Sequence, residues 1–142
     1  AEEKIIYIPQ SPFIFKASLI DNLCMTNKYL NSEEVLSCVQ NLIEMGLSKK
    51  RIEQLIKNDD ISDIISGGEG QRIALARLVY SKNYSNSSLI LLDEPTSSLD
   101  NNSSNLTAKW ITKLKGTKVI VTHDSNLFKN YKNIKYLHIS VK

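Results

Sequence analysis

The stretch that decides the fold is Leu89-Ile90-Leu91-Leu92-Asp93-Glu94, four apolar residues followed by two carboxylates. A short, fully apolar run predicts a strand covered on both sides within an α/β sheet, and ligands in such sheets gather at the carboxyl ends of strands. Carboxylates at that position could hold a metal ion and orient or deprotonate an attacking water. Two acids that simply face solvent explain the pattern about equally well, so the run alone leaves its chemistry open.

A second short segment, Ser66-Gly67-Gly68-Glu69, leads into a helix that we predict over residues 69–80. Glycine leaves backbone amides exposed, and the positive end of a helix dipole attracts anions. The Ser66 hydroxyl adds a donor. Since a flexible helix start has the same appearance, the glycine pair alone favours the purely structural interpretation.

Two further polar side chains follow predicted strands. Gln10 follows a strand over residues 4–9, and His123 follows a strand over residues 118–122. A long amide can reach a metal-bound water and a neighbouring surface, and a neutral imidazole can donate to a terminal phosphate. Each residue alone is unremarkable. Together, Gln10, Asp93-Glu94 and His123 at carboxyl ends of strands and Ser66 at a helix start all occupy positions where ligands bind.

The spacing of apolar residues predicts an α/β fold with a partly parallel sheet and a helical subdomain inserted into it. Predicted helices cover residues 18–23, 32–45, 48–57, 69–80, 100–114 and 126–131, and predicted strands cover 4–9, 89–92, 118–122 and 135–141. We therefore divide the chain into residues 1–10, a helical subdomain over 11–80, and an α/β part over 81–142.

Composition limits the possible functions. The net charge is +3, with 18 basic and 15 acidic residues well mixed, so no nucleic-acid partner is expected. Cys24 and Cys38 form no CxxC pair, which argues against a zinc site and favours a reducing compartment. No run of about 18 apolar residues exists, so no membrane span is expected.

Five ordered segments together resemble the nucleotide-binding domain of ATP-binding cassette (ABC) proteins. They are similar to the Q-loop (residues 7–10), the ABC signature (65–69) with its helix (to 77), Walker B with the catalytic glutamate (89–94), the D-loop (97–100) and the switch histidine segment (122–124). The resemblance implies a partial core sheet of the P-loop NTPase kind with a helical signature subdomain. Residues 11–15 and 18–23 are similar to the segment that, in exporter-type members, faces the coupling helices of the transmembrane domain.

The resemblance implies a role for each strand-end residue, catalytic for Glu94 and His123 and metal-binding for Asp93 and Gln10. Asp93 would hold Mg²⁺, and Glu94 would polarise the water that attacks ATP. His123 would contact the γ-phosphate, and Gln10 would sense both the metal and the transmembrane domain.

The resemblance implies that the signature turn, Ser66-Gly67-Gly68, serves a different ATP molecule from the one that the strand-end residues serve. In this family two nucleotide-binding domains pack head to tail, so Ser66, Gly67 and Gly68 would bind the γ-phosphate of ATP held by the second domain. Glu69 stands at a signature position where glutamine is usual, which places a negative charge near that phosphate. Asp100 would communicate across the dimer.

The lysine-bearing phosphate loop of the family, Walker A, has no counterpart in the 142 residues. It requires G-x-x-x-x-G-K-[ST], and none of the five glycines is followed by lysine. The simplest interpretation is that the chain is the C-terminal portion of such a domain. We expect the isolated chain to bind ATP poorly, not to hydrolyse it, and to self-associate through unpaired strand edges and core surface.

The predicted function is therefore a part of the ATP-hydrolysing domain of a bacterial ABC exporter, at the cytoplasmic face of the cell membrane. One alternative is a non-catalytic half-domain that supplies signature contacts to another chain. Another is a non-transport ABC ATPase of DNA repair or chromosome maintenance. That class predicts a coiled coil or a zinc insert between Gln10 and Ser66, and the sequence there shows no heptads and no residues spaced as zinc ligands.

Overall fold

The computed structural model describes residues 4–25, 30–81, 83–86 and 88–137. Three strands form one parallel sheet in the order β1-β2-β3: β1 (Lys4–Ile8), β2 (Ser88–Asp93) and β3 (Thr117–Val121). The helices are α1 (Leu19–Leu23), α2 (Ser32–Glu44), α3 (Lys49–Ile56), α4 (Gly67–Leu78) and α5 (Asn101–Thr112). The predicted α/β class is confirmed, and the sheet is parallel throughout the described residues.

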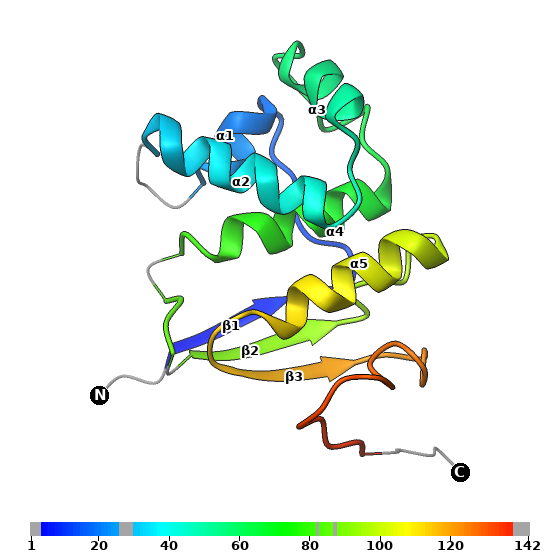
Figure 1. Cartoon of the computed structure of the whole chain (residues 1–142). Coiled ribbons are helices and arrows are strands. Elements are labelled where there is room, and N and C mark those ends of the chain that lie inside the picture. The colour runs from blue at the N-terminus through cyan, green and yellow to red at the C-terminus, as the bar shows by residue number, and fades with distance from the viewer. Residues whose placement is uncertain (1–3, 26–29, 82, 87, 138–142) are drawn as a thin grey trace.

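The elements are stacked in layers above the sheet. Figure 1 shows α4 and α5 next to the strands, with α1, α2 and α3 farther from the sheet. The chain leaves the sheet after β1, passes through four helices and returns as β2, which allows neighbouring strands to run parallel. This route brings the segments that follow β1, β2 and β3 to the same edge of the sheet.

Each helix of the described chain begins at a side chain that accepts a hydrogen bond from the first turn. These N-cap residues are Ser18, Asn31, Ser48, Ser66 and Asp100. Such caps satisfy N–H groups that lack a partner within the helix and stabilise it by about 1 kcal/mol each. The start of α4 at Gly67 lies two residues before the predicted start, because the cap at Ser66 already fixes the first turn.

The core lies between the sheet and the helices and continues among the helices themselves. Along β2 the side chains alternate, with Ile90 and Leu92 fully buried and Leu89 and Leu91 half-buried. Burial of one such aliphatic side chain contributes about 1.5–3 kcal/mol. A tight turn returns the chain from α5 to β3 at Gly116, where φ is +87° and a Cβ would lie 2.4 Å from the Ser88 carbonyl oxygen.

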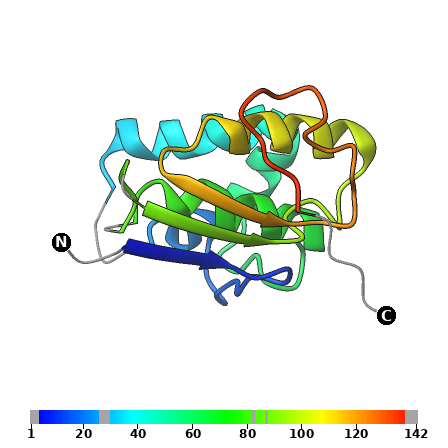
Figure 2. The same ribbon diagram turned by 90° about the horizontal axis from the view of Figure 1, so that it is seen from below.

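The opposite face of the sheet is open, so the prediction of strands covered on both sides is wrong for the described residues. Ile5, Tyr7, Val119 and Val121 point to this face and are 51%, 59%, 48% and 58% exposed. Figure 2 shows the strands in front of the helices, with no helix drawn over β1 and β2. The helices of the described chain all pack on one face, which leaves an apolar surface on the other.

The end of the chain differs from the prediction. Residues 126–131 form consecutive turns in place of a helix, with bonds such as Lys129 N–H to Asn126 O at 3.1 Å and Tyr131 N–H to Phe128 O at 3.1 Å. Asparagine competes with helical bonding through its own side chain, which favours turns. Residues 135–137 are not in a strand, and residues 138–141 of the predicted strand lie outside the described residues.

No helix in the described ranges is long and apolar enough to cross a membrane.

Candidate functional site

A buried glutamine of α4 holds two loops of the site together, the one after β1 and the one after β2. Gln71 is 2% exposed, and its Nε2 lies 2.9 Å from the Gln10 carbonyl oxygen, 3.1 Å from the Glu94 carbonyl oxygen and 3.2 Å from Ser97 Oγ. Its Oε1 accepts from the Ser98 N–H at 3.4 Å. Both ends of one amide are therefore satisfied by the segments that follow β1 and β2.

Sequence reasoning did not single out Gln71 as a site residue. It stands inside the helix that follows the signature, and a long polar side chain between the apolar residues of a buried helix was the available signal. Buried polar side chains are almost always hydrogen-bonded, so a glutamine in a buried helix indicates hydrogen-bond partners in the segments packed against that helix.

The side chain of Gln10 is exposed and reaches the segment after β2. Its Nε2 donates to Ser97 Oγ at 3.3 Å, while the backbone carbonyl oxygen of Gln10 accepts from Gln71 Nε2. The predicted strand-end position of Gln10 is thus next to the predicted D-loop.

Glu94 and His123 face each other across the ends of β2 and β3. Glu94 N–H donates to the Val121 carbonyl oxygen at 2.8 Å, and Glu94 Oε1 accepts from His123 N–H at 3.0 Å. Oε1 also lies 3.3 Å from His123 Nε2. The Glu94 side chain is 12% exposed, and the His123 side chain is 99% exposed. The backbone φ of Glu94 is +46°, a left-handed conformation that non-glycine residues adopt mainly where surrounding structure enforces it.

Asp93 ends β2 beside Val121 of β3 and is half-buried. Within the described ranges, no group of three or more His, Cys, Asp or Glu side chains could hold a metal ion. Protein Mg²⁺ sites often use only one or two carboxylates and complete the shell with water and substrate phosphates. Asp93 beside the Gln10 loop fits that kind of partial shell.

The signature turn presents hydrogen-bond donors at the start of α4. Ser66 Oγ accepts from Glu69 N–H at 3.1 Å, which leaves the hydroxyl hydrogen free to donate elsewhere. The N–H groups of Gly67 and Gly68 belong to the first turn, where a helix supplies no carbonyl partner. This arrangement suits an anion.

The Glu69 carboxylate lies at the start of α4, between Ser66 and Arg51 of α3. Arg51 Nε and Nη2 donate to its two carboxylate oxygens at 2.8 and 3.0 Å, and Ser66 N–H donates to Oε1 at 3.0 Å. Burial alone would raise the pKa of Glu69, but the hydrogen bonds from Arg51 and Ser66 outweigh burial and hold the pKa below its usual value.

The signature turn packs directly on the segment after β2. A Cβ on Gly68 would lie 2.6 Å from Leu99 Cδ2 and 2.7 Å from the Ser98 carbonyl oxygen, so only glycine permits this approach. Asp100, the next residue, caps α5 by accepting from Ser103 N–H at 2.7 Å. That backbone hydrogen bond lowers the pKa of the exposed Asp100 carboxyl.

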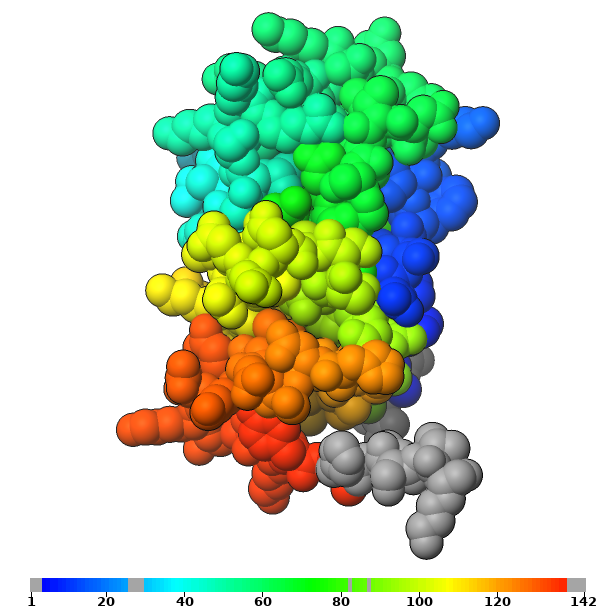
Figure 3. Space-filling view, turned by 90° about the vertical axis from the view of Figure 1, so that its right-hand side faces the viewer, coloured from blue at the N-terminus to red at the C-terminus, as the bar shows by residue number. Residues whose placement is uncertain are grey.

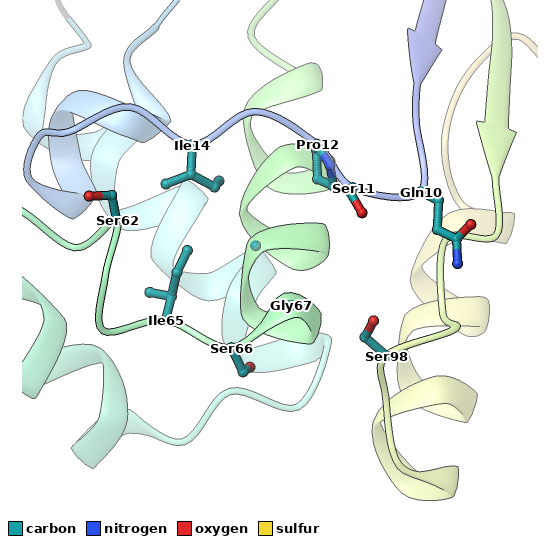
Figure 4. Close-up of a pocket in the computed structure, with 10 residues that line it drawn as sticks. Gln10, Ser11, Pro12, Ile14, Ser62, Ile65, Ser66, Gly67 and Ser98 are labelled. Atoms are coloured by element: carbon teal, nitrogen blue, oxygen red, sulfur yellow. The ribbon is translucent and has the colours of Figure 1, made fainter.

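A pocket of about 210 Å³ lies between the signature turn and the segments after β1 and β2. It is lined by Gln10, Ser11, Pro12, Ile14, Ser62, Ile65, Ser66, Gly67, Gly70 and Ser98. Figure 4 shows the loop from Gln10 to Ile14 on one side of it, with Ser66 and Ser98 facing each other below. Figure 3 shows the segment after β1, in blue, beside the green and yellow-green surface.

The predicted residues thus fall into two groups. Gln10, Ser66 and Gly67 line the pocket, whereas the other predicted residues lie outside its lining: Gly68, Glu69, Asp93, Glu94, Asp100 and His123. Gln71 connects the two groups, because it bonds to Gln10 and to the backbone of Glu94.

Comparison with known proteins agrees with the resemblance seen in the sequence. The family model described as ABC transporter matches residues 1–97. A lactococcin-A transport/processing ATP-binding protein of Lactococcus lactis is 34% identical over 122 residues, which cover 84% of this chain and 16% of that protein. A sublancin-168-processing and transport ATP-binding protein of Bacillus subtilis is 26% identical over 133 residues, which cover 93% and 18%. The chain spans about a sixth of the length of these curated relatives.

Solved structures share the fold. A bacterial Atm1-family ABC exporter with ATP bound superposes with a TM-score of 0.67 at 19% identity, over 88% of this chain and 22% of that chain. A dimeric bacterial ABC transporter cassette gives a TM-score of 0.65 at 25% identity, over 89% of this chain and 55% of that chain. The family match over more than half of the residues decides the assignment: this chain belongs to the ABC transporter family.

Proposed function

We propose that the chain forms part of the ATP-binding and ATP-hydrolysing domain of a bacterial ABC exporter, at the cytoplasmic face of the membrane. The observation that carries the proposal is the bonding of Gln71, which joins Gln10, the Glu94 turn and Ser97 beside the signature turn. A single buried side chain thereby connects residues suited to metal, water and phosphate chemistry.

The strand-end residues serve hydrolysis. Asp93 and Gln10 would hold Mg²⁺, which would supply charge neutralisation for the phosphates of ATP. Glu94 accepts a proton from the attacking water, and its nearly buried carboxylate is positioned by His123 N–H. The exposed His123 imidazole is free to turn toward a γ-phosphate.

The signature residues serve a second nucleotide. Ser66, Gly67 and Gly68 supply hydroxyl and amide donors to the γ-phosphate of ATP held by a second nucleotide-binding domain, packed head to tail. Asp100 follows the segment that packs on Gly68 and communicates across that interface. The superposition with a dimeric cassette supports this arrangement.

The chain's own residues do not fit a complete nucleotide site. The 142 residues contain no G-x-x-x-x-G-K-[ST] motif, whose amides and lysine hold the β- and γ-phosphates in P-loop ATPases. We therefore expect the isolated chain to bind Mg-ATP weakly and not to hydrolyse it. Calorimetry that finds micromolar affinity for the isolated chain contradicts this expectation.

A membrane-domain contact is proposed for the segment after β1. Phe13 is 68% exposed and Phe15 38% exposed, and their rings meet edge to face with centroids 4.7 Å apart. Two exposed aromatic rings in contact form an apolar surface suited to a coupling helix. The relatives named for lactococcin and sublancin transport support an exporter.

The decisive test is ATP hydrolysis by a full-length exporter that contains this segment, reconstituted in lipid vesicles. The wild type should hydrolyse ATP only with Mg²⁺, Asp93→Asn should lose that activity, and the exposed Asp59→Asn should keep it. Absence of hydrolysis in all three contradicts the function, and hydrolysis by Asp93→Asn contradicts the role of Asp93.

Self-association is proposed for the isolated chain. The open face carries Ile5, Tyr7, Val119 and Val121, and β1 and β3 are the outer strands of the sheet in the described residues. Exposed apolar surface and unpaired strand edges both favour association between copies. A stable monomer in light scattering contradicts the proposal.

A further inference from the structure

We infer that Arg51 is a positioning residue for the signature turn: it neutralises Glu69 and so keeps the donors of Ser66, Gly67 and Gly68 favourable for phosphate. The inference rests on the proposed function, and it concerns a residue of α3 that lies outside the signature sequence. Neither Arg51 nor its helix belongs to the segments that resemble family motifs.

The pair has the geometry of a strong, oriented interaction. Arg51 Nε lies 2.8 Å from Glu69 Oε2, and Nη2 lies 3.0 Å from Oε1, so two nitrogens of one guanidinium face two oxygens of one carboxylate. The Glu69 side chain is 11% exposed and that of Arg51 is 31% exposed. Parallel bonds of this kind fix orientation as well as charge.

Arg51 also fixes the chain that enters the signature turn. Nη2 donates to the Ile64 carbonyl oxygen at 2.7 Å, two residues before Ser66. Glu69 in turn accepts from Ser66 N–H and donates its own N–H to Ser66 Oγ. Arg51, Glu69 and Ser66 therefore form a continuous chain of bonds that ends at the donor hydroxyl.

The charge of Glu69 makes the partner necessary. A carboxylate in the first turn of α4 repels an anion bound by the neighbouring N–H groups, whereas a neutral glutamine would not. Arg72 adds positive charge nearby, but its guanidinium is bonded to the carbonyl oxygens of Gly68 and Met45. Arg51 is the cation that is bonded to the carboxylate itself.

A mutant cycle separates this electrostatic role from simple stabilisation. In the reconstituted exporter we expect Arg51→Ala to raise KM for ATP about tenfold, because a nearly buried carboxylate then stands unpaired beside the phosphate. Adding Glu69→Gln to Arg51→Ala should return KM most of the way, although it restores no bond to α3. The exposed neighbour Lys50→Ala is the matched control and should leave KM unchanged.

The cycle has two outcomes that overturn the inference: an unchanged KM in Arg51→Ala, or an equally raised KM in the double variant, which would indicate a structural role alone. If the exporter hydrolyses no ATP, the proposed function fails, and the inference is then tested by phosphate binding to the isolated chain. Inorganic phosphate, followed by NMR, should then shift the Gly67 and Gly68 amide signals in the wild type and the double variant more than in Arg51→Ala. Equal or absent shifts in all three overturn it.

Discussion

The carboxylate of Glu94 accepts a hydrogen bond from the backbone N–H of His123 at 3.0 Å, and the same oxygen lies 3.3 Å from His123 Nε2. The turn after β2 and the turn after β3 are thereby joined through one oxygen atom. Since the backbone of Glu94 is left-handed, with φ of +46°, the carboxylate is directed along the strand ends by the structure around it.

This relationship predicts the result of replacing Glu94 by glutamine. The amide oxygen can still accept from His123 N–H, so the turn should keep its shape, but an amide cannot accept a proton from water. We expect Glu94→Gln in the reconstituted exporter to lower kcat by about 10²–10⁴-fold with ATP binding retained. The exposed Glu53→Gln is the control, and a kcat near the wild-type value in Glu94→Gln would exclude Glu94 as the base.

Gln71 predicts a stability effect in the isolated chain. Gln71→Glu keeps the shape but replaces the –NH₂ group by an oxygen that faces the oxygens of Gln10, Glu94 and Ser97. We expect the free energy of unfolding to fall by about 2–3 kcal/mol at neutral pH, because buried acceptors lose their donor. Urea unfolding measures this.

The same substitution at exposed Gln40 of α2 provides the control for Gln71→Glu and should change the free energy of unfolding by less than about 0.5 kcal/mol. Acid should also reduce the loss at residue 71, since a protonated glutamic acid regains one O–H donor. A loss under about 0.5 kcal/mol at neutral pH would show that Gln71 does not hold the loops.

Cys38 predicts a pH effect. Burial raises the pKa of this thiol to about 12, with a smaller contribution from nearby Cys24. The folded chain therefore retains a proton that the unfolded chain loses near pH 9, so the stabilisation present below about pH 9 should be lost as pH rises toward 12. Urea unfolding of the wild type should show a steeper loss across this range than unfolding of Cys38→Ala, and equal slopes would contradict the assignment.

Much of the fold was predictable because local rules and burial agree. The apolar run before Asp93 forms β2, and Ser66 caps α4. Both features were predictable because the local sequence alone favours these conformations. The prediction of a helix over residues 126–131 was wrong: Phe128 and Tyr131 have helical spacing, but the asparagines around them favour turns. The open face of the sheet was not predictable, because the apolar residues of a strand do not indicate whether one or both of its faces are covered by helices.

The site was predictable as a set of residues but not as a set of contacts. Gln10, Asp93 and His123 were placed at strand ends by pattern alone, and parallel pairing brings those ends together. The bonds of Gln71 and the pairing of Arg51 with Glu69 join positions far apart in the sequence. No periodicity records such contacts, because they depend on how the helices pack.

Two glycines of α4 predict opposite effects of the same substitution. A Cβ on Gly68 would overlap Leu99 Cδ2 at 2.6 Å and the Ser98 carbonyl oxygen at 2.7 Å, whereas one on Gly70 would meet only Ile14 and Ile65 at 3.5 Å or more. We expect Gly68→Ala to lower the free energy of unfolding by about 1–3 kcal/mol through overpacking. Gly70→Ala should raise it by up to about 1 kcal/mol through better helix propensity. Thermal unfolding of both variants tests the close approach of signature turn and D-loop, and an equal gain in both would show that the two segments are not in contact.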